Sequence, residues 1–302
     1  MTIRVRVPAT SANLGPGFDS LGVTLDLWNE LEVEKEGVTL QISVEGEGHQ
    51  EIARDKNNAI YRAMLTYAQR HHKTLPNGLI LRCKNRIPIS SGLGSSAAAA
   101  VAGIKAAAEI LGFAQDLDGQ LECATLLEGH PDNVAPCLMG GLVAAIVEEQ
   151  QVIARNLPIT QLPLMVAVPD FHFSTRASRA NLPHEISRKD AVYNLGRLAL
   201  LTHALASGDL DLLARAMQDK IHQPFRLPVI PGAQEALTAA QNEGAAAVAL
   251  SGAGPSLLIF LRDENQFERV STALRQAFSQ AGLESRIYSP KISQTGASME
   301  II

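Results

Sequence analysis

Residues 88–98 read Pro88-Ile89-Ser90-Ser91-Gly92-Leu93-Gly94-Ser95-Ser96-Ala97-Ala98, a glycine- and serine-rich turn that runs directly into an alanine-rich segment. Glycine adopts positive φ and lets the backbone approach a ligand, and serine is a common cap at a helix start. A glycine loop before a helix N-terminus favours an anion such as phosphate, through unpaired N–H groups and the helix dipole. No lysine follows the glycines, so this is not a Walker sequence, and a structural turn before a buried helix stays open as an alternative.

The periodicity on either side of this loop predicts a mixed α+β chain. A helix is expected from Ser96 to Leu111, with Gly112 at the place of a left-handed cap. Alternating apolar and charged residues predict a first strand over residues 3–7. The other predicted helices cover residues 58–72, 117–128, 190–206, 209–219, 232–243 and 264–281, and the other strands lie near residues 27–33, 40–44, 79–83, 246–251, 256–261 and 285–289.

Two strand–helix passes in the second half indicate an α+β sandwich of ferredoxin type. A proline-bounded apolar segment, residues 157–168, begins this half, so we place a domain boundary near residue 155. The predicted domains are therefore residues 1–155 and residues 156–302.

Composition narrows the classes of function. Of the 302 residues, 46% are hydrophobic and 19% charged, which predicts an ordered chain with a sizeable core. The net charge of −5 provides no basic surface for nucleic acid or for an anionic membrane. The first residues lack an apolar signal segment, and Cys83, Cys123 and Cys137 lack metal-site spacing. We therefore expect a cytoplasmic protein with reduced thiols and small-molecule partners; whether it forms a homodimer stays open.

Three further blocks accompany the glycine loop, namely VPATSANLGPGFDSLG at residues 7–22, EGHPDNVAP at 128–136 and SGAGPS at 251–256. Together, and in this order, the four blocks resemble the signatures of the GHMP kinases, which include galactokinase, homoserine kinase, mevalonate kinase and phosphomevalonate kinase. The first and third blocks along the chain are more similar to homoserine kinases than to the other members. Four blocks in family order are far more specific than one glycine loop.

The resemblance implies an α+β fold of two domains, an N-terminal ribosomal-S5-like domain and a C-terminal ferredoxin-like domain, with the active site between them. It also implies a kinase that uses ATP and Mg²⁺ to phosphorylate the side-chain hydroxyl of L-homoserine, a step of threonine biosynthesis. One alternative is another GHMP kinase, such as an L-threonine kinase. A second is a catalytically dead relative, although such proteins usually lose the glycine loop or the metal carboxylate, and both are present in this chain.

The resemblance assigns the nucleotide phosphates to two loops and the metal to one hydroxyl and one carboxylate. Glu128 and Ser96 are the expected Mg²⁺ ligands, and Glu122 is a weaker alternative to Glu128. Asn57 or Asn58, before a predicted helix, is our guess for an adenine contact. The candidate ATP-binding residues are Pro88, Ile89, Ser90, Ser91, Gly92, Leu93, Gly94, Ser95, Ser96, Ala97, Ala98, Gly252, Ala253 and Gly254.

The first block and the second half supply the residues that the resemblance points at the amino-acid substrate. Asn13 and Asp19 are expected there, with Asp19 suited to an α-ammonium group, although both residue types also shape turns. Arg179 and Arg226 resemble a pair of carboxylate-binding arginines, since a guanidinium group matches a carboxylate bidentately. Thr175 is a further candidate in the block that holds Arg179. Arg176, in the same block, is expected on the surface.

The third block carries the candidate for the reacting end of the substrate. Asn133 stands where mevalonate kinases have a catalytic Asp. An amide cannot take a proton, so we expect Asn133 to orient the acceptor hydroxyl, with catalysis by Asn133, Ser96 and Glu128. Phosphoryl transfer depends mainly on positioning and charge neutralisation, so no dedicated general base is required. The role of Asp132 stays open, and His130 and His222 are expected to be structural.

Overall fold

The apolar alternation of residues 3–7 builds an inner strand of the first sheet, next to its edge strand. In the computed structural model, which describes residues 2–149 and 151–302, Ile3, Val5 and Val7 are buried in antiparallel register with the second strand, for example Val5 opposite Leu31. Across this sheet the strands are β11 (Ser298–Ile301), β1 (Thr2–Asn13), β2 (Gly17–Glu34), β4 (Leu79–Asn85) and β3 (Leu40–Gly46), with β5 (Leu142–Glu148) and β6 (Gln151–Leu157) joined through the start of β2.

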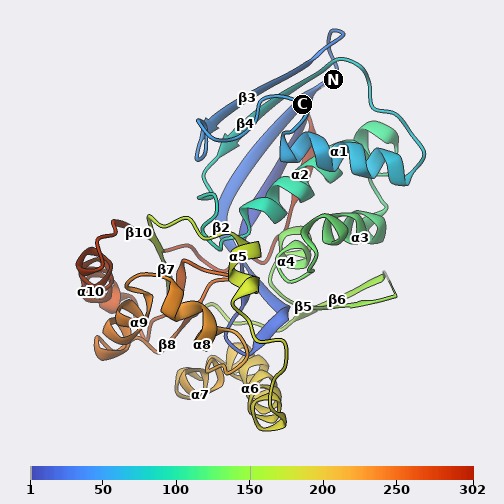
Figure 1. The fold of residues 1–302 in the computed structure, drawn as a ribbon. Helices are drawn as coiled ribbons and strands as arrows, with labels where there is room; N and C mark the ends of the chain where they lie inside the picture. Colours follow the sequence, from blue (N-terminus) through green and yellow to red (C-terminus); the bar gives the residue numbers. More distant parts are fainter. Residues whose placement is uncertain (1, 150) are drawn as a thin grey trace.

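The alanine-rich segment after the glycine loop forms the central helix of the first half. Small side chains allow close helix packing: a Cβ at Gly103 would lie 2.3 Å from the Ile60 carbonyl oxygen of the neighbouring helix. The predicted end is confirmed, because Gly112 caps the helix with φ of +83°. The helices here are α1 (Ala59–Arg70), α2 (Ser95–Leu111), α3 (Leu117–Glu128) and α4 (Val134–Met139), as Figure 1 shows.

The start of this helix differs from the prediction in one respect. Neither Ser95 nor Ser96 caps α2 with its side chain, because the N-cap position is Gly94 at φ +69° and no side-chain cap hydrogen bond is made. The Ser96 hydroxyl donates to Glu128 instead, at 2.6 Å. The first N–H groups of α2 thus lie beside a glycine loop rather than under a serine cap.

The second sheet is antiparallel and buried on both faces. Along its central strand, Met165 and Ala167 belong to one hydrophobic core with the helices at residues 233–242 and 267–280, whereas Val166 and Val168 belong to the other. This double burial explains the uninterrupted apolar sequence of that strand. In order the strands are β10 (Ser285–Tyr288), β7 (Leu164–Pro169), β9 (Leu257–Phe260) and β8 (Ala247–Leu250).

The helices of the second half pack around the second sheet, and the short helix α5 lies near the first half. In Figure 1, α9 and α10 lie on one side of the second sheet, α6 and α7 lie below it, and α5 sits between the two halves. Their bounds are α5 (Thr175–Ala180), α6 (Arg188–Ser207), α7 (Leu210–Ala216), α8 (Gln223–Arg226), α9 (Ala233–Asn242) and α10 (Phe267–Gln280), with 3₁₀ turns η1 (Leu227–Val229) and η2 (Glu264–Gln266).

The chain passes from the first sheet to the second between Leu157 and Leu164, and the boundary near residue 155 stays a prediction. Strand β11 was not predicted; it returns to the first sheet and pairs with β1, with Val5 opposite Met299. The two ends of the chain therefore lie side by side in Figure 1. Among the described residues, no helix is both long and apolar enough to cross a membrane.

Candidate active site

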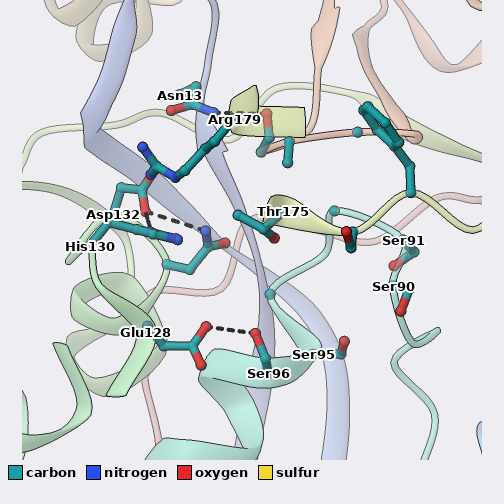
Figure 2. A pocket seen from close by; sticks show the side chains of 18 of the residues that line it. Asn13, Ser90, Ser91, Ser95, Ser96, Glu128, His130, Asp132, Thr175 and Arg179 are labelled. Carbon is teal, nitrogen blue, oxygen red and sulfur yellow. Dashed lines mark hydrogen bonds and ion pairs between the residues drawn. The ribbon is translucent and has the colours of Figure 1, made fainter. Parts of the chain in front are cut away.

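The four sequence blocks, far apart in the chain, meet around one cavity of about 240 Å³. Figure 2 shows this pocket, with Glu128 and Ser96 at one end, Arg179 at the other, and His130 and Asp132 between them. Of the predicted site residues, those that line it are Asn13, Asp19, Ser90, Ser91, Gly92, Gly94, Ser95, Ser96, Glu128, Asn133, Thr175, Arg179, Arg226, Gly252, Ala253 and Gly254. The predicted residues outside its lining are Pro88, Ile89, Leu93, Ala97 and Ala98.

Two glycines of the 88–98 loop are required by both conformation and space. Gly92 has φ of +82° and Gly94 has φ of +69°, which side chains rarely adopt. A Cβ at Gly94 would lie 2.1 Å from the Thr10 hydroxyl oxygen, and one at Gly92 would lie 2.3 Å from the Ser251 carbonyl oxygen. Glycine at these positions therefore lets three backbone segments approach one another at the N-terminus of α2.

The loop of the fourth block, residues 251–256, is tied to the glycine loop and to β1. The Ser251 hydroxyl lies 2.8 Å from the Ser11 hydroxyl and 2.7 Å from the Gly92 carbonyl oxygen. The backbone N–H of Gly252 donates to the Ala12 carbonyl at 3.0 Å. These contacts hold the 251–256 loop of the second half against the 88–98 loop and β1 of the first half, and together these segments form the rim of the cavity beside the N-terminus of α2.

Glu128 ends α3 and points at the start of α2. Its carboxylate accepts a hydrogen bond from the Ser96 hydroxyl at 2.6 Å (Figure 2). Burial raises the pKa of Glu128, and the hydrogen bond from Ser96 only partly opposes this rise. The alternative, Glu122, pairs with Arg70 of α1 and does not line the cavity. The geometry thus favours Glu128 over Glu122 as the carboxylate that would hold a cation beside the phosphate loop.

Asn133 is fixed by a buried hydroxyl behind it. The Thr10 hydroxyl donates to the Asn133 side-chain oxygen at 2.8 Å, which leaves the amide nitrogen on the side of Asp132, 3.4 Å from its Oδ1. Asp132 in turn pairs with Nδ1 of His130. Burial lowers the pKa of His130, but the hydrogen bond to Asp132 and its charge outweigh this effect and leave the pKa raised. The Asp132 carboxylate is therefore already engaged by the His130 ring.

Asp19 and Arg179 form a bidentate ion pair in the cavity, with nitrogen–oxygen distances of 2.9 and 2.7 Å. The hydrogen bond to Asp19 raises the pKa of Arg179. Asn13 shapes the turn that presents Asp19: its Oδ1 accepts from the Asp19 N–H at 3.0 Å, and its amide donates to the Gly252 carbonyl at 2.8 Å. Asn13 thus lines the cavity, its Oδ1 stabilises the turn that holds Asp19, and its amide nitrogen ties that turn to the 251–256 loop.

Arg226 is almost completely buried, with 1% of its surface exposed, yet it lacks an anionic partner. Among the described residues no carboxylate lies within ion-pair distance of it, and its Nε has no hydrogen-bond partner. One terminal nitrogen donates to the Gly252 carbonyl at 3.3 Å. Burial, with the nearby charge of Arg179, lowers the pKa of Arg226 to about 10. Because a buried charge is costly without a partner, this end of the cavity is chemically suited to an anion.

Thr175 and Arg176, in the same segment as Arg179, differ in whether they line the cavity. Thr175 is the first residue of α5 and lines the cavity, whereas Arg176 is exposed and does not line it. The hydroxyl of Ser178 donates to the Ala253 carbonyl at 3.2 Å, so α5 packs against the 251–256 loop.

Comparison with known proteins identifies this arrangement. The GHMP kinases N terminal domain matches residues 58–141, and the GHMP kinases C terminal domain matches residues 201–280. The chain belongs to the GHMP kinase family. Among its members, the homoserine kinase of Moorella thermoacetica is 46% identical over 94% of this chain and 95% of that protein. The homoserine kinase of Deinococcus radiodurans is 42% identical over 98% and 96% of the two chains.

Solved structures of GHMP kinases share the whole fold. The crystal structure of homoserine kinase from Cytophaga hutchinsonii superposes with a TM-score of 0.86 at 30% identity, covering 99% of this chain and 97% of that one. Mevalonate kinase of L. major, in complex with R-mevalonate, superposes with a TM-score of 0.73 at 18% identity, covering 95% and 94%. The second likeness concerns the fold alone. The α+β, two-domain GHMP kinase fold implied by the four blocks is thus confirmed.

A second cavity of this GHMP kinase, about 340 Å³, adjoins the first and shares Ser90, Ser95 and Ser96 with it. It was not predicted as a separate cavity. Part of its wall is the 88–98 loop (Ile89, Ser90, Ser95, Ser96 and Ala98), but the rest comes from strand and helix residues outside the four blocks. Its apolar lining includes Leu31, Ile52, Ile60, Ile87, Ile89 and Ala98.

The two asparagines suggested for adenine differ in position. Asn58 lines the second cavity, but its Oδ1 accepts from the Ile60 N–H at 3.0 Å and its amide donates to the Ala53 carbonyl at 2.8 Å. Asn57 is exposed and lies outside that lining. Asn58 therefore shapes the wall with a side chain whose hydrogen-bonding groups are already engaged.

Proposed function

We propose that this protein transfers the γ-phosphoryl group of ATP to the side-chain hydroxyl of L-homoserine, giving ADP and O-phospho-L-homoserine. The observation that carries the proposal is a single cavity with a phosphate-type loop at one end and an unpaired buried cation, Arg226, at the other. The same name, homoserine kinase, is carried by relatives that are 38–46% identical over nearly the whole chain.

The nucleotide fits the two adjoining cavities. Apolar side chains and concave shape are typical of sites for aromatic ligands, so the adenosine part is assigned to the second cavity. Its phosphates would then pass Ser95 and Ser96 and reach the N-terminus of α2, where N–H groups of the glycine loop and the helix dipole stabilise negative charge. Gly252 to Gly254 close the rim from the other domain.

The residues at the start of α2 also fit Mg²⁺. This cation takes one or two carboxylates and otherwise phosphate oxygens and water. Glu128 and Ser96, 2.6 Å apart, would supply one carboxylate and one hydroxyl, and the described residues contain no cluster of three or more metal-ligating side chains. When bound, the ion neutralises charge on the phosphates.

The other end of the cavity fits a zwitterion. Asp19 and Arg179 are each half-buried and paired with each other, so an α-ammonium group and an α-carboxylate would replace one partner each. Arg226 then completes the carboxylate site with a cation that has no protein counter-ion. The Asp19–Arg179 pair would thus be replaced by two pairs, Asp19 with the ammonium group and the arginines with the carboxylate. Each buried charge at this end would then have a partner of opposite sign, which buried charges require.

Between these two ends lies the group that meets the reacting hydroxyl. The Asn133 amide nitrogen faces Asp132, while its oxygen is held by Thr10, so the amide has an N–H to offer the hydroxyl oxygen. In the reaction the hydroxyl oxygen bonds to the γ-phosphorus, the bond from that phosphorus to the bridging oxygen of ADP breaks, and the hydroxyl proton passes to the transferred phosphate. Asp132 is occupied by His130, so positioning rather than base catalysis accounts for the step.

The test is ADP release, coupled to an optical readout, with L-homoserine, L-threonine and mevalonate as acceptors. We expect kcat/KM for L-homoserine to exceed that for either alternative by at least about a hundredfold. The hydroxyl of L-threonine would be displaced from Asn133 and the γ-phosphate, and mevalonate has no ammonium group to pair with Asp19. A preference for L-threonine would assign the second candidate function. Absence of turnover with all three, despite ATP binding, would indicate a dead relative.

A further inference from the structure

The anion receptor Arg226 is held by a histidine that lies outside the cavity. His222 stands one helical turn before Arg226, at the N-cap position of α8, and its surface is fully buried. Its Nε2 lies 2.8 Å from the Gly15 carbonyl oxygen, and its Nδ1 lies 3.3 Å from a terminal nitrogen of Arg226. One ring therefore links the first signature turn to the arginine.

These partners fix the state of the His222 ring. A carbonyl oxygen only accepts a hydrogen bond and a guanidinium group only donates one, so Nε2 carries the proton and Nδ1 accepts from Arg226. The ring is neutral in this arrangement, because a proton on Nδ1 would point at the guanidinium group. A neutral acceptor orients Arg226 without neutralising its charge, whereas a carboxylate in the same place would occupy the receptor.

The ring is itself fixed from two sides. The buried carboxylate of Asp219 accepts backbone N–H groups from Ile221, His222 and Gln223 at 2.9, 2.9 and 2.7 Å, which sets the start of α8. On its other side the His222 ring stacks on Phe18, with centroids 5.3 Å apart and planes at 23°.

Phe18 also faces both arginines of the site. The guanidinium carbon of Arg226 lies 5.2 Å from its ring centroid, and that of Arg179 lies 5.6 Å from it. Such contacts are attractive between a cation and an aromatic face. Phe18 belongs to the first signature, so a half-buried ring of one domain supports two cations of the other.

We propose that His222 and Phe18 are positioning residues that set the specificity of the site for an anionic end group, His222 by orienting Arg226 and Phe18 by supporting Arg226 and Arg179. The proposal rests on the proposed function of that cavity. Both residues act through the arginines, so their loss changes how well a carboxylate is held and leaves the phosphate loop and Glu128 intact.

Two replacements of His222 separate the roles of its nitrogens. In His222→Gln the amide reaches the position of Nε2 and keeps the contact with Gly15, but the acceptor for Arg226 is lost. In His222→Asn the side chain reaches only the position of Nδ1, so the acceptor is kept and the Gly15 contact is lost. We expect His222→Gln to raise KM for L-homoserine about tenfold, which corresponds to about 1.4 kcal/mol, and His222→Asn to raise it less. Equal or reversed effects would overturn the proposal.

Further readouts distinguish positioning from a general loss of structure. KM for ATP should change less than twofold in His222→Gln and in His222→Asn. Phe18→Leu should lower the preference for L-homoserine over its methyl ester, which lacks the carboxylate charge. The matched control is His71→Gln, because His71 is stacked on Phe113, at 4.1 Å, outside the cavity lining. This control should change thermal stability but neither KM. A parallel rise of both KM values in the His222 variants would show a structural role only.

The closing experiment does not depend on the identity of the substrate. Nitrogen NMR of histidine-labelled protein should show His222 as the neutral Nε2–H tautomer at neutral pH, with an Nδ1 resonance that moves in Arg226→Leu. A protonated ring, an Nδ1–H tautomer or an unchanged Nδ1 resonance would refute the positioning of Arg226 even if homoserine turnover is high. Conversely, the expected spectra without homoserine turnover would refute the proposed function and keep the ring assignment.

Discussion

The two ends of the cavity would bind charged groups by different means. At the phosphate end the candidate binding groups are backbone N–H groups, and its glycine loop and the residues that line it beside Ser95 and Ser96 contain no lysine or arginine. At the other end the candidate groups are side chains, Arg179 and Arg226 for a carboxylate and Asp19 for an ammonium group, and both arginines lie more than 150 residues after Asp19 in the chain. A backbone site is destroyed by adding atoms, whereas a side-chain site is destroyed by removing them.

The largest effect is expected from an addition at the phosphate end. In Gly94→Val the backbone would keep a φ of +69°, which a β-branched residue does not tolerate, and the new Cβ would collide with the Thr10 hydroxyl. We expect nucleotide binding to fall by at least about a thousandfold, measured by titration with ATP or a non-hydrolysable analogue.

Ser90→Ala is the matched removal in the same loop. Ser90 lines the cavity, but none of the hydrogen bonds of the described residues involves its hydroxyl. Affinity for the nucleotide should change less than about threefold. If Gly94→Val and Ser90→Ala are equally tolerated, the phosphate end is not a backbone site and the comparison fails.

Glu128 is the charged side chain at the phosphate end, so its removal tests whether the backbone alone suffices. Glu128→Ala should lower kcat by about a hundredfold or more at saturating Mg²⁺, because the metal then loses its protein carboxylate. Glu122→Ala removes a carboxylate from the same helix that pairs with Arg70, and its kcat should stay near that of the wild type. Near-normal turnover of Glu128→Ala would move the metal role elsewhere.

Removal of an arginine at the other end of the cavity should leave nucleotide binding nearly unchanged. Arg226→Leu and Arg179→Leu should lower kcat/KM for L-homoserine by about 10- to 1,000-fold, the range for a buried charge left with no partner, with KM for ATP nearly unchanged. Both should narrow the preference for L-homoserine over its methyl ester. Exposed Arg176 is the internal control, and Arg176→Leu should be mild. Full discrimination between acid and ester in both variants would place the carboxylate site elsewhere.

The smallest effect concerns stability. Burial raises the pKa of Glu128 above 4.5, so the folded protein favours the protonated carboxyl, and stability is lost as pH rises from 4.5 through the raised pKa. Glu128→Gln, which mimics the protonated form, should raise the unfolding midpoint by about 1–2 °C at pH 7 without metal, and by less at pH 4. A gain that is larger at pH 4 would contradict this sign.

The same contrast explains what the sequence could predict. The glycine loop is contiguous, and its meaning follows from local chemistry, so the helix from residue 95 to Leu111 and its glycine cap were predicted closely. The roles of Arg179 and Arg226 came only from resemblance, because nothing local distinguishes them from Arg176. Burial does distinguish them, and it depends on how α5 packs against Asp19 and the 251–256 loop and how α8 packs against the turn at Gly15.

Other features were missed for physical reasons. The prediction that a serine caps α2 was wrong, because the N-cap position falls on Gly94 and both serines lie inside the first turn of the helix. The Ser96 hydroxyl donates to Glu128 instead. His222 was expected to be structural, and its contact with Arg226 depends on a turn four residues long that no periodicity announces. The strand β11 is short, half of its pattern is polar, and its partner is at the other end of the chain, so local reasoning had no access to it.

That last strand has a consequence for synthesis in the cell. Strand β1 carries Asn13 at one end and is the last strand of the first sheet before β11, so the strand that covers its outer edge along residues 3–6 is made of residues 298–301. A chain emerging from the ribosome has made the whole nucleotide half long before that partner exists. During this interval the edge of β1 is open to other strands, including those of neighbouring nascent chains. The register of Val5 with Met299 thus makes completion of the first domain wait for synthesis of the second.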